Sequence, residues 1–213
     1  MSLELLELPV LPDASSGHPC DGCQSGCCRS FVVPLSLGDI VRIARGTGLS
    51  FWDFAVRWDD SEGKIARGQV PHFHFEDEPQ TPFVIGLKHV ESQTFSGATR
   101  CRFLAEAAEG ATCGIYEHRP MACRIFPATS VDDVLKIASI PQFGRPGNDP
   151  AYRLCGRQWR LDDIDWSEKQ AEFEQCREEM ALMRLLAERW NREPGDWLFF
   201  PEFLNAIWQR IAA

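Results

Sequence analysis

The sequence has few lysines, an excess of acidic residues and no long apolar run. Only 4 of its 22 basic residues are lysine, and 31 acidic residues give the 213-residue chain a formal net charge of −9. This balance offers no basic surface for a nucleic-acid backbone, so we predict no nucleic-acid partner. The apolar stretches fall well short of the ~18 residues that a membrane-spanning helix needs, so we also predict no membrane segment.

Several motifs of common enzymes are also missing. The chain has no Walker-type phosphate loop, no dinucleotide-binding glycine triplet and no serine nucleophile elbow. Its first residues, 1–13, include glutamates but no lysine or arginine and no long apolar core, which is not the pattern of a secretory signal. We therefore expect a cytoplasmic protein, in a compartment where disulfides are rare and clustered thiols usually bind metal or catalyse.

Cysteine, by contrast, is abundant, with 9 residues. Four of them lie in the segment Cys20-Asp-Gly-Cys23-Gln-Ser-Gly-Cys27-Cys28. The C-x-x-C spacing lets two sulfur atoms of one tight turn face the same metal. Neighbouring side chains diverge, so either Cys27 and Cys28 serve different centres or one of them is structural. For this segment the spacing favours metal binding over buried free thiols or disulfides.

The remaining cysteines are more widely spaced. They are Cys101, Cys113, Cys123, Cys155 and Cys176. Pro120 and Pro127 bracket Cys123 and predict a short helical turn with this thiol near its N-terminus, a position that favours the thiolate. We interpret Cys176 as an ordinary core residue. For the other four, spacing favours metal ligands but leaves packing residues as an alternative.

Arginine residues are frequent beside the cysteines. Those within two residues of a cysteine are Arg29, Arg100, Arg102, Arg124, Arg153, Arg157 and Arg177. Guanidinium groups there would offset the negative charge of a thiolate-ligated centre and donate hydrogen bonds to sulfur. Because 18 of the residues are arginine, several such neighbours are also expected by chance.

The order of these motifs resembles a known family. The pattern C-x₂-C-x₃-C-C, then C-x-F-L, C-x-I-Y-x-x-R-P-x-x-C-R-x-F-P and a later cysteine, is similar to that of the YkgJ family of cysteine-cluster proteins, over residues 18–157. The resemblance implies a zinc- or iron-chelating, or iron–sulfur, protein. It implies eight metal ligands: Cys20, Cys23, Cys27, Cys28, Cys101, Cys113, Cys123 and Cys155. A related cysteine module in flagellin lysine-N-methylases implies an alternative, a metal-dependent enzyme that uses S-adenosylmethionine.

The spacing also bears on which metal is bound. Structural zinc sites usually combine two C-x₂₋₄-C knuckles, whereas this chain has one and otherwise solitary cysteines. Iron–sulfur clusters are wider than a single ion and can collect scattered thiolates. We expect a [4Fe–4S] cluster, with Zn²⁺ in a structural or interaction protein as the alternative. The partner is an unidentified protein or small molecule. His18 and His118 are secondary candidates as ligands.

Periodicity predicts an α+β fold in which a small sheet and several helices surround the cysteine-rich site, with a C-terminal helical pair. The predicted organisation is an N-terminal arm at 1–17, a metal-binding domain at 18–160 and a packed helical extension at 161–213. Predicted helices are 37–46, 51–58, 165–190 and 201–211, and predicted strands are 83–90 and 134–140. In the segment 72–75 we expect Phe73 and Phe75 to be buried, with His72 and His74 in solvent rather than on metal.

Overall fold

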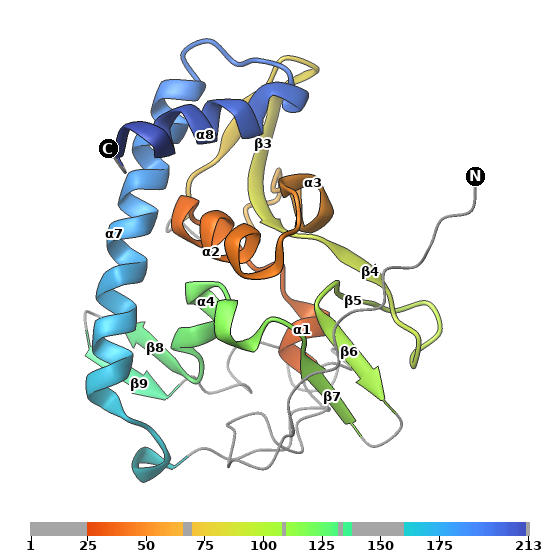
Figure 1. Cartoon of the computed structure of the whole chain (residues 1–213), viewed down its shortest axis with the longest axis vertical. Coiled ribbons are helices and arrows are strands. Elements are labelled where there is room, and N and C mark those ends of the chain that lie inside the picture. The colour runs from red at the N-terminus through yellow and green to blue at the C-terminus, as the bar shows by residue number, and fades with distance from the viewer. Residues whose placement is uncertain (1–24, 66–69, 108–109, 132–133, 138–159, 212–213) are drawn as a thin grey trace.

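The structure is a computed structural model that describes residues 25–65, 70–107, 110–131, 134–137 and 160–211 (Figure 1). The expectations for residues 1–17, Cys20, Cys23 and Cys155 concern residues outside these ranges. The predicted α+β class is confirmed, because the structure combines helices with small antiparallel sheets. No helix in the described part of the chain is long and apolar enough to span a membrane.

The elements follow one another in this order. The helices are α1 (Gly26–Ser30), α2 (Leu37–Thr47), α3 (Phe51–Phe54), η1 (Tyr116–His118), α4 (Met121–Ile125), η2 (Leu161–Asp163), α7 (Trp166–Trp190), η3 (Trp197–Phe199) and α8 (Phe200–Ile211). The strands are β1 (Ala55–Asp59), β2 (Phe73–Phe75), β3 (Glu78–Leu87), β4 (His89–Glu91), β5 (Thr99–Cys101), β6 (Leu104–Ala107), β7 (Gly110–Cys113), β8 (Ala128–Val131) and β9 (Val134–Ile137).

The long helices form close to where the sequence predicts them. Helix α2 starts with a capping box, in which the Ser36 hydroxyl accepts from the Asp39 N–H and the Asp39 carboxylate accepts from the Ser36 N–H, each over 2.9 Å. It ends before Gly48, whose φ of 71° lies in the left-handed region that favours glycine. Helix α7 starts after its cap Asp165, as predicted.

The sheet corrects one prediction. We expected a helix over 51–58, but the helix ends at Phe54, and Ala55–Asp59 forms β1, which pairs antiparallel with β3. The pairing satisfies the backbone groups of five residues, so this tertiary contact overrides the local helical signal. Strand β3 lies between β1 and β2. The strand predicted over 83–90 is split, because β3 ends at Leu87 and β4 begins at His89.

The aromatic core lies in the upper part of the molecule as drawn in Figure 1, where α7 and α8 lie beside α2 and β3. Phe73 and Phe75 are buried as predicted, and Phe200 of α8 packs on both, with ring centroids 5.0 and 5.5 Å away. His72 and His74 are half-buried rather than solvated, and the His72 ring lies 2.9 Å from the Asp60 carboxylate. The C-terminal helices thus share one core with α2 and the sheet, and the domain boundary at 160 stays a prediction.

Short elements make up the lower part of the molecule. The strands there form three separate two-stranded ladders, β4–β5, β6–β7 and β8–β9. Helix α1 packs against β5, and α4 packs against α7 (Figure 1). Most of the described cysteines lie on these short elements.

Candidate metal centre

Four thiols from four separate segments lie near enough to one another to raise one another's pKa. They belong to Cys28 of α1, Cys101 at the end of β5, Cys113 at the end of β7 and Cys123 of α4. Burial raises the pKa of Cys28 well above its usual value, and the neighbouring thiols of Cys123, Cys101 and Cys113 raise it further. None of these four forms a disulfide with another described residue. The fold therefore brings near one another reduced cysteines that are up to 95 positions apart in the chain, from Cys28 to Cys123.

Two of the thiols are positioned by paired loops. The Gly114 N–H donates to the Phe103 carbonyl over 2.8 Å, which places the turns after Cys101 and Cys113 side by side. Burial raises the pKa of Cys101 to about 11, while the Phe103 backbone N–H acts in the opposite direction through its hydrogen bond to sulfur. Burial also raises the pKa of Cys113, and the Ile115 N–H opposes it in the same way. Such N–H groups stabilise a thiolate, the form that ligates metal.

The third thiol is positioned by a buried aspartate. Burial raises the pKa of Cys123 strongly, and the thiols of Cys101 and Cys113 add to the effect. The helix that carries Cys123 begins at Met121, whose N–H donates to the Asp39 carboxylate over 2.8 Å. Asp39 is fully buried and also caps α2. One carboxylate therefore fixes the starts of α2 and α4 relative to each other.

The fourth thiol is held through an ion-pair network. Arg29, next to Cys28 on α1, forms an ion pair with Glu106 of β6, and Arg100 of β5 pairs with the same carboxylate over 3.1 Å. The Glu106 side chain is only 2% exposed, and it also accepts from Ser92 over 2.7 Å. The network joins α1 to β5 and β6, so it keeps Cys28 beside the other thiols.

The arginines act differently from one another. Arg100 and Arg102 lower the pKa of Cys101, as an offsetting charge beside a thiolate would. Arg124 instead pairs with Glu172 of α7 over 3.0 Å. Arg119 was not among the predicted arginines, yet it lowers the pKa of both Cys113 and Cys123 and stacks on Tyr116 with its guanidinium carbon 3.6 Å from the ring centroid. Its signal was present, because it is the arginine of the C-x-I-Y-x-x-R-P motif.

Other candidate ligands lie elsewhere or are not described. Cys176 of α7 lies near Asp39 and Glu179, and burial raises its pKa to about 12 with their help. The His118 ring packs on Gly46 of α2, where a Cβ would be 2.2 Å from it. Among the residues that the structure describes, no three histidine, cysteine, aspartate or glutamate side chains are grouped as a single metal ion would require.

A comparison with protein families adds independent information. A family model described as "CxxCxxCC: putative zinc- or iron-chelating domain" matches residues 19–144, more than half of the chain. The chain belongs to the CxxCxxCC family. No curated protein matches the chain. No solved structure matches it.

The CxxCxxCC match covers most of the expected ligands. It spans both cysteine groups from Cys20 to Cys123, whereas Cys155 and Cys176 lie beyond its end. This chain has three residues rather than two between Cys23 and Cys27, so it departs from the spacing in the family's name. Membership supports chelation of zinc or iron by cysteine and does not choose between the two metals.

Proposed function

We propose that this protein carries a cysteine-ligated metal centre, that the centre is an iron–sulfur cluster of the [4Fe–4S] type, and that the chain is a YkgJ-like member of its family. The observation that carries the proposal is the convergence of Cys28, Cys101, Cys113 and Cys123, each from a different segment. If the four cysteines were only packing residues, there would be no reason for their thiols to lie close enough to raise one another's pKa. A metal cation supplies the charge that makes four neighbouring thiolates stable.

The surroundings of the thiols fit such a centre. The N–H groups of Phe103 and Ile115 bond to sulfur, and Arg119 adds positive charge near two of the thiols. Hydrogen bonds and nearby charges of this kind orient thiolate ligands and tune the metal that they hold. The ligand set in the proposal includes Cys20, Cys23, Cys27 and Cys155, which supply sulfur from outside or from the edge of the described region. Eight thiols are enough for more than one centre.

The spread of the thiols supports iron–sulfur over zinc. The four described thiols come from four separate segments, whereas structural zinc sites usually draw on two C-x₂₋₄-C knuckles, of which this chain has one. A cluster of several iron atoms is wider, and each cysteine needs to reach only one corner of it. When bound, such a cluster supplies one-electron redox chemistry. The protein's own contribution is to hold the thiols, exclude water from them and place Arg119 near them.

The test replaces one ligand and one matched cysteine. We expect Cys123→Ser to purify with less than half the metal of the parent and to precipitate more readily, because ligation energy is also folding energy. Cys176→Ser is the control, since this residue carries the same thiol on α7 outside the family match. It should keep the parent's metal content.

Elemental analysis and the melting temperature of both variants measure the outcome. Equal metal content in Cys123→Ser and the parent would show that Cys123 is a packing residue and that the ligand set proposed here is wrong. Loss of metal in both variants would show that the effect reflects general damage to the fold.

A further inference from the structure

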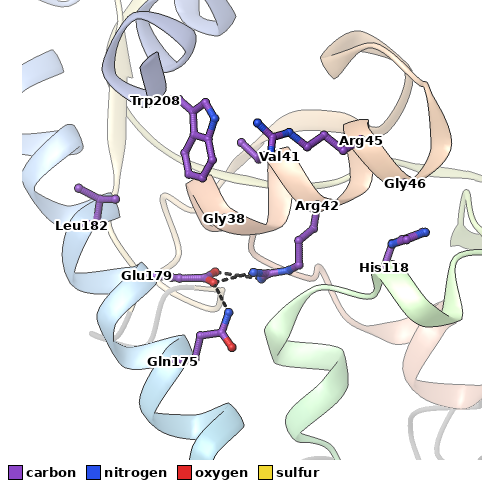
Figure 2. Close-up of a pocket in the computed structure, with 10 residues that line it drawn as sticks. All are labelled: Gly38, Val41, Arg42, Arg45, Gly46, His118, Gln175, Glu179, Leu182 and Trp208. Atoms are coloured by element: carbon purple, nitrogen blue, oxygen red, sulfur yellow. Dashed lines mark hydrogen bonds and ion pairs between the residues drawn. The ribbon is translucent and has the colours of Figure 1, made fainter. Parts of the chain in front are cut away.

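A pocket of about 580 Å³ opens on the side of α2 that faces α7, α8 and η1 (Figure 2). The pocket shares α2 with Asp39, whose carboxylate accepts from the Met121 N–H at the start of the helix that carries Cys123. Two glycines of α2 shape it. A Cβ at Gly38 would be 2.5 Å from the Glu179 carboxyl carbon, and one at Gly46 would be 2.2 Å from the His118 ring. Both side chains therefore lie directly against the α2 backbone.

The pocket lining carries positive charge on an acidic protein. Two arginines, Arg42 and Arg45, and one carboxylate, Glu179, line it, whereas the whole chain has a net charge of −9. Glu179 is fully engaged, because it accepts from Arg42 over 2.6 Å and from Gln175 over 2.9 Å (Figure 2). This pairing neutralises Arg42 and leaves the charge of Arg45 uncompensated within the pocket.

Three hydrogen-bond donors in the lining have no acceptor among the described residues. Arg45 forms neither a hydrogen bond nor an ion pair there, and its guanidinium carbon lies 5.6 Å from the centroid of the Trp208 ring. The indole N–H of Trp208 and the ring of His118 likewise have no described partner. A guanidinium stacked on an aromatic ring keeps its N–H edge available for a bidentate oxygen ligand. Arg45 is exposed and the other two side chains are half-buried, so water can solvate these donors in the free protein and a ligand oxygen can replace that water.

The remaining wall of the pocket is apolar. Val41 of α2, Leu182 of α7 and the indole of Trp208 form it, and Figure 2 shows Leu182 and Trp208 on the side opposite His118. A free inorganic anion would satisfy the donors but leave this wall exposed to water. Pockets of this size commonly combine an apolar wall with a few polar groups that fix the orientation of a small molecule.

We propose that this pocket binds a small organic anion, whose carboxylate lies against Arg45 and whose apolar or aromatic body lies against Trp208 and Leu182. The inference goes beyond the proposed metal centre, and it does not depend on which metal is bound. Arg45 provides the positive charge, and His118 and Trp208 provide further hydrogen-bond donors. The Arg42–Glu179 ion pair forms another part of the pocket wall.

The probe is benzoate, titrated into the protein as purified and followed by calorimetry. We expect benzoate to bind with a Kd of about 1 mM or tighter. Benzyl alcohol lacks the charge and should bind at least about tenfold more weakly. Arg45→Gln should weaken benzoate binding about tenfold. The matched control is Arg189→Gln, an exposed residue of α7 that is not in the lining, which removes the same charge and should change the Kd by less than about twofold.

Four results would overturn the proposal. They are no binding of benzoate at about 10 mM, an equal effect of Arg45→Gln and Arg189→Gln, equal affinity for benzyl alcohol, and equal or tighter binding of inorganic phosphate, which would make the apolar wall irrelevant. Binding of S-adenosylmethionine without binding of benzoate would also contradict it and would favour the enzymatic alternative. Metal content measured on the same samples separates these results from a failure of the metal-centre proposal.

Discussion

The aromatic core and the cysteine region of this protein are built by opposite means. In the aromatic core, formed by α2, α3, β1–β3, α7 and α8, large rings contact one another directly, as Trp190 and Phe200 do with centroids 5.0 Å apart. In the cysteine region, formed by α1, β4–β7, η1 and α4, each helix or strand has five residues or fewer. The first part forms most of the apolar interior, and the second consists of short segments that join this interior through Cys101, Phe103 and Ile115.

This difference indicates how each part is stabilised. Helices of one turn and isolated two-stranded ladders are marginal in water, because they bury too little surface to offset the entropy of ordering the chain. The aromatic core overcomes that cost through burial. The cysteine region has buried ion pairs, the Asp39 contact to α4 and a gathering of thiols. A bound metal centre would cross-link these short segments. Substitutions in the aromatic core and removal of metal should therefore have distinguishable effects.

The largest expected effect is in the aromatic core. Phe200→Ala removes a fully buried ring that contacts Phe75, Trp190 and Trp197. We expect it to lower the free energy of unfolding by about 3–5 kcal/mol. Because the rings that Phe200 contacts belong to the aromatic core, metal per folded molecule should stay unchanged. Denaturant unfolding measures the loss of stability, and metal analysis of the same samples measures the metal content. Loss of metal from fully folded protein would contradict the distinction between the two parts.

A smaller effect is expected at the ion pairs of the cysteine region. Glu106→Gln leaves Arg29 and Arg100 buried without their carboxylate and should lower the free energy of unfolding by about 2–3 kcal/mol. We also expect faster release of metal to a chelator, because α1 loses its tie to β6. The control is Glu62→Gln, which removes the same charge from an exposed ion pair with Lys64. Equal behaviour of the two variants would show that the network does not position Cys28.

The smallest effect concerns pH. In the metal-free protein, burial raises the pKa of Cys101 from 9.0 to about 11, and raises those of Cys28, Cys113 and Cys123 as well. The unfolded chain then releases its protons first, so stability present below pH 9 is lost as the pH rises toward 11. Thiols already ligated as thiolates cannot lose these protons. We expect Tm to fall across this interval in the metal-free protein and to change less in the metal-loaded one; parallel curves would contradict this.

The sequence predicted the aromatic core better than the cysteine region. Helices α2 and α7 start after the side-chain caps Ser36 and Asp165, and α8 has Pro201 beside its first residue, so their starts were correct to within one residue. The prediction for 51–58 was wrong because β1 is specified by its pairing with β3, which no local pattern reveals. In the cysteine region the spacing predicted a set of ligands, of which Cys28, Cys101, Cys113 and Cys123 lie near one another in the structure. It could not show that Asp39, 82 positions before Met121 in the chain, fixes α4, because that contact exists only in the folded chain.

The most direct test of the central claim is the metal content and absorption spectrum of the protein purified without oxygen. We expect a brown protein that absorbs near ~400 nm and contains iron and sulfide, because we propose that the converging cysteines hold an iron–sulfur cluster. A colourless protein with zinc at full occupancy would contradict the cluster and retain the cysteine-ligated centre. A folded protein without any bound metal would contradict the account as a whole.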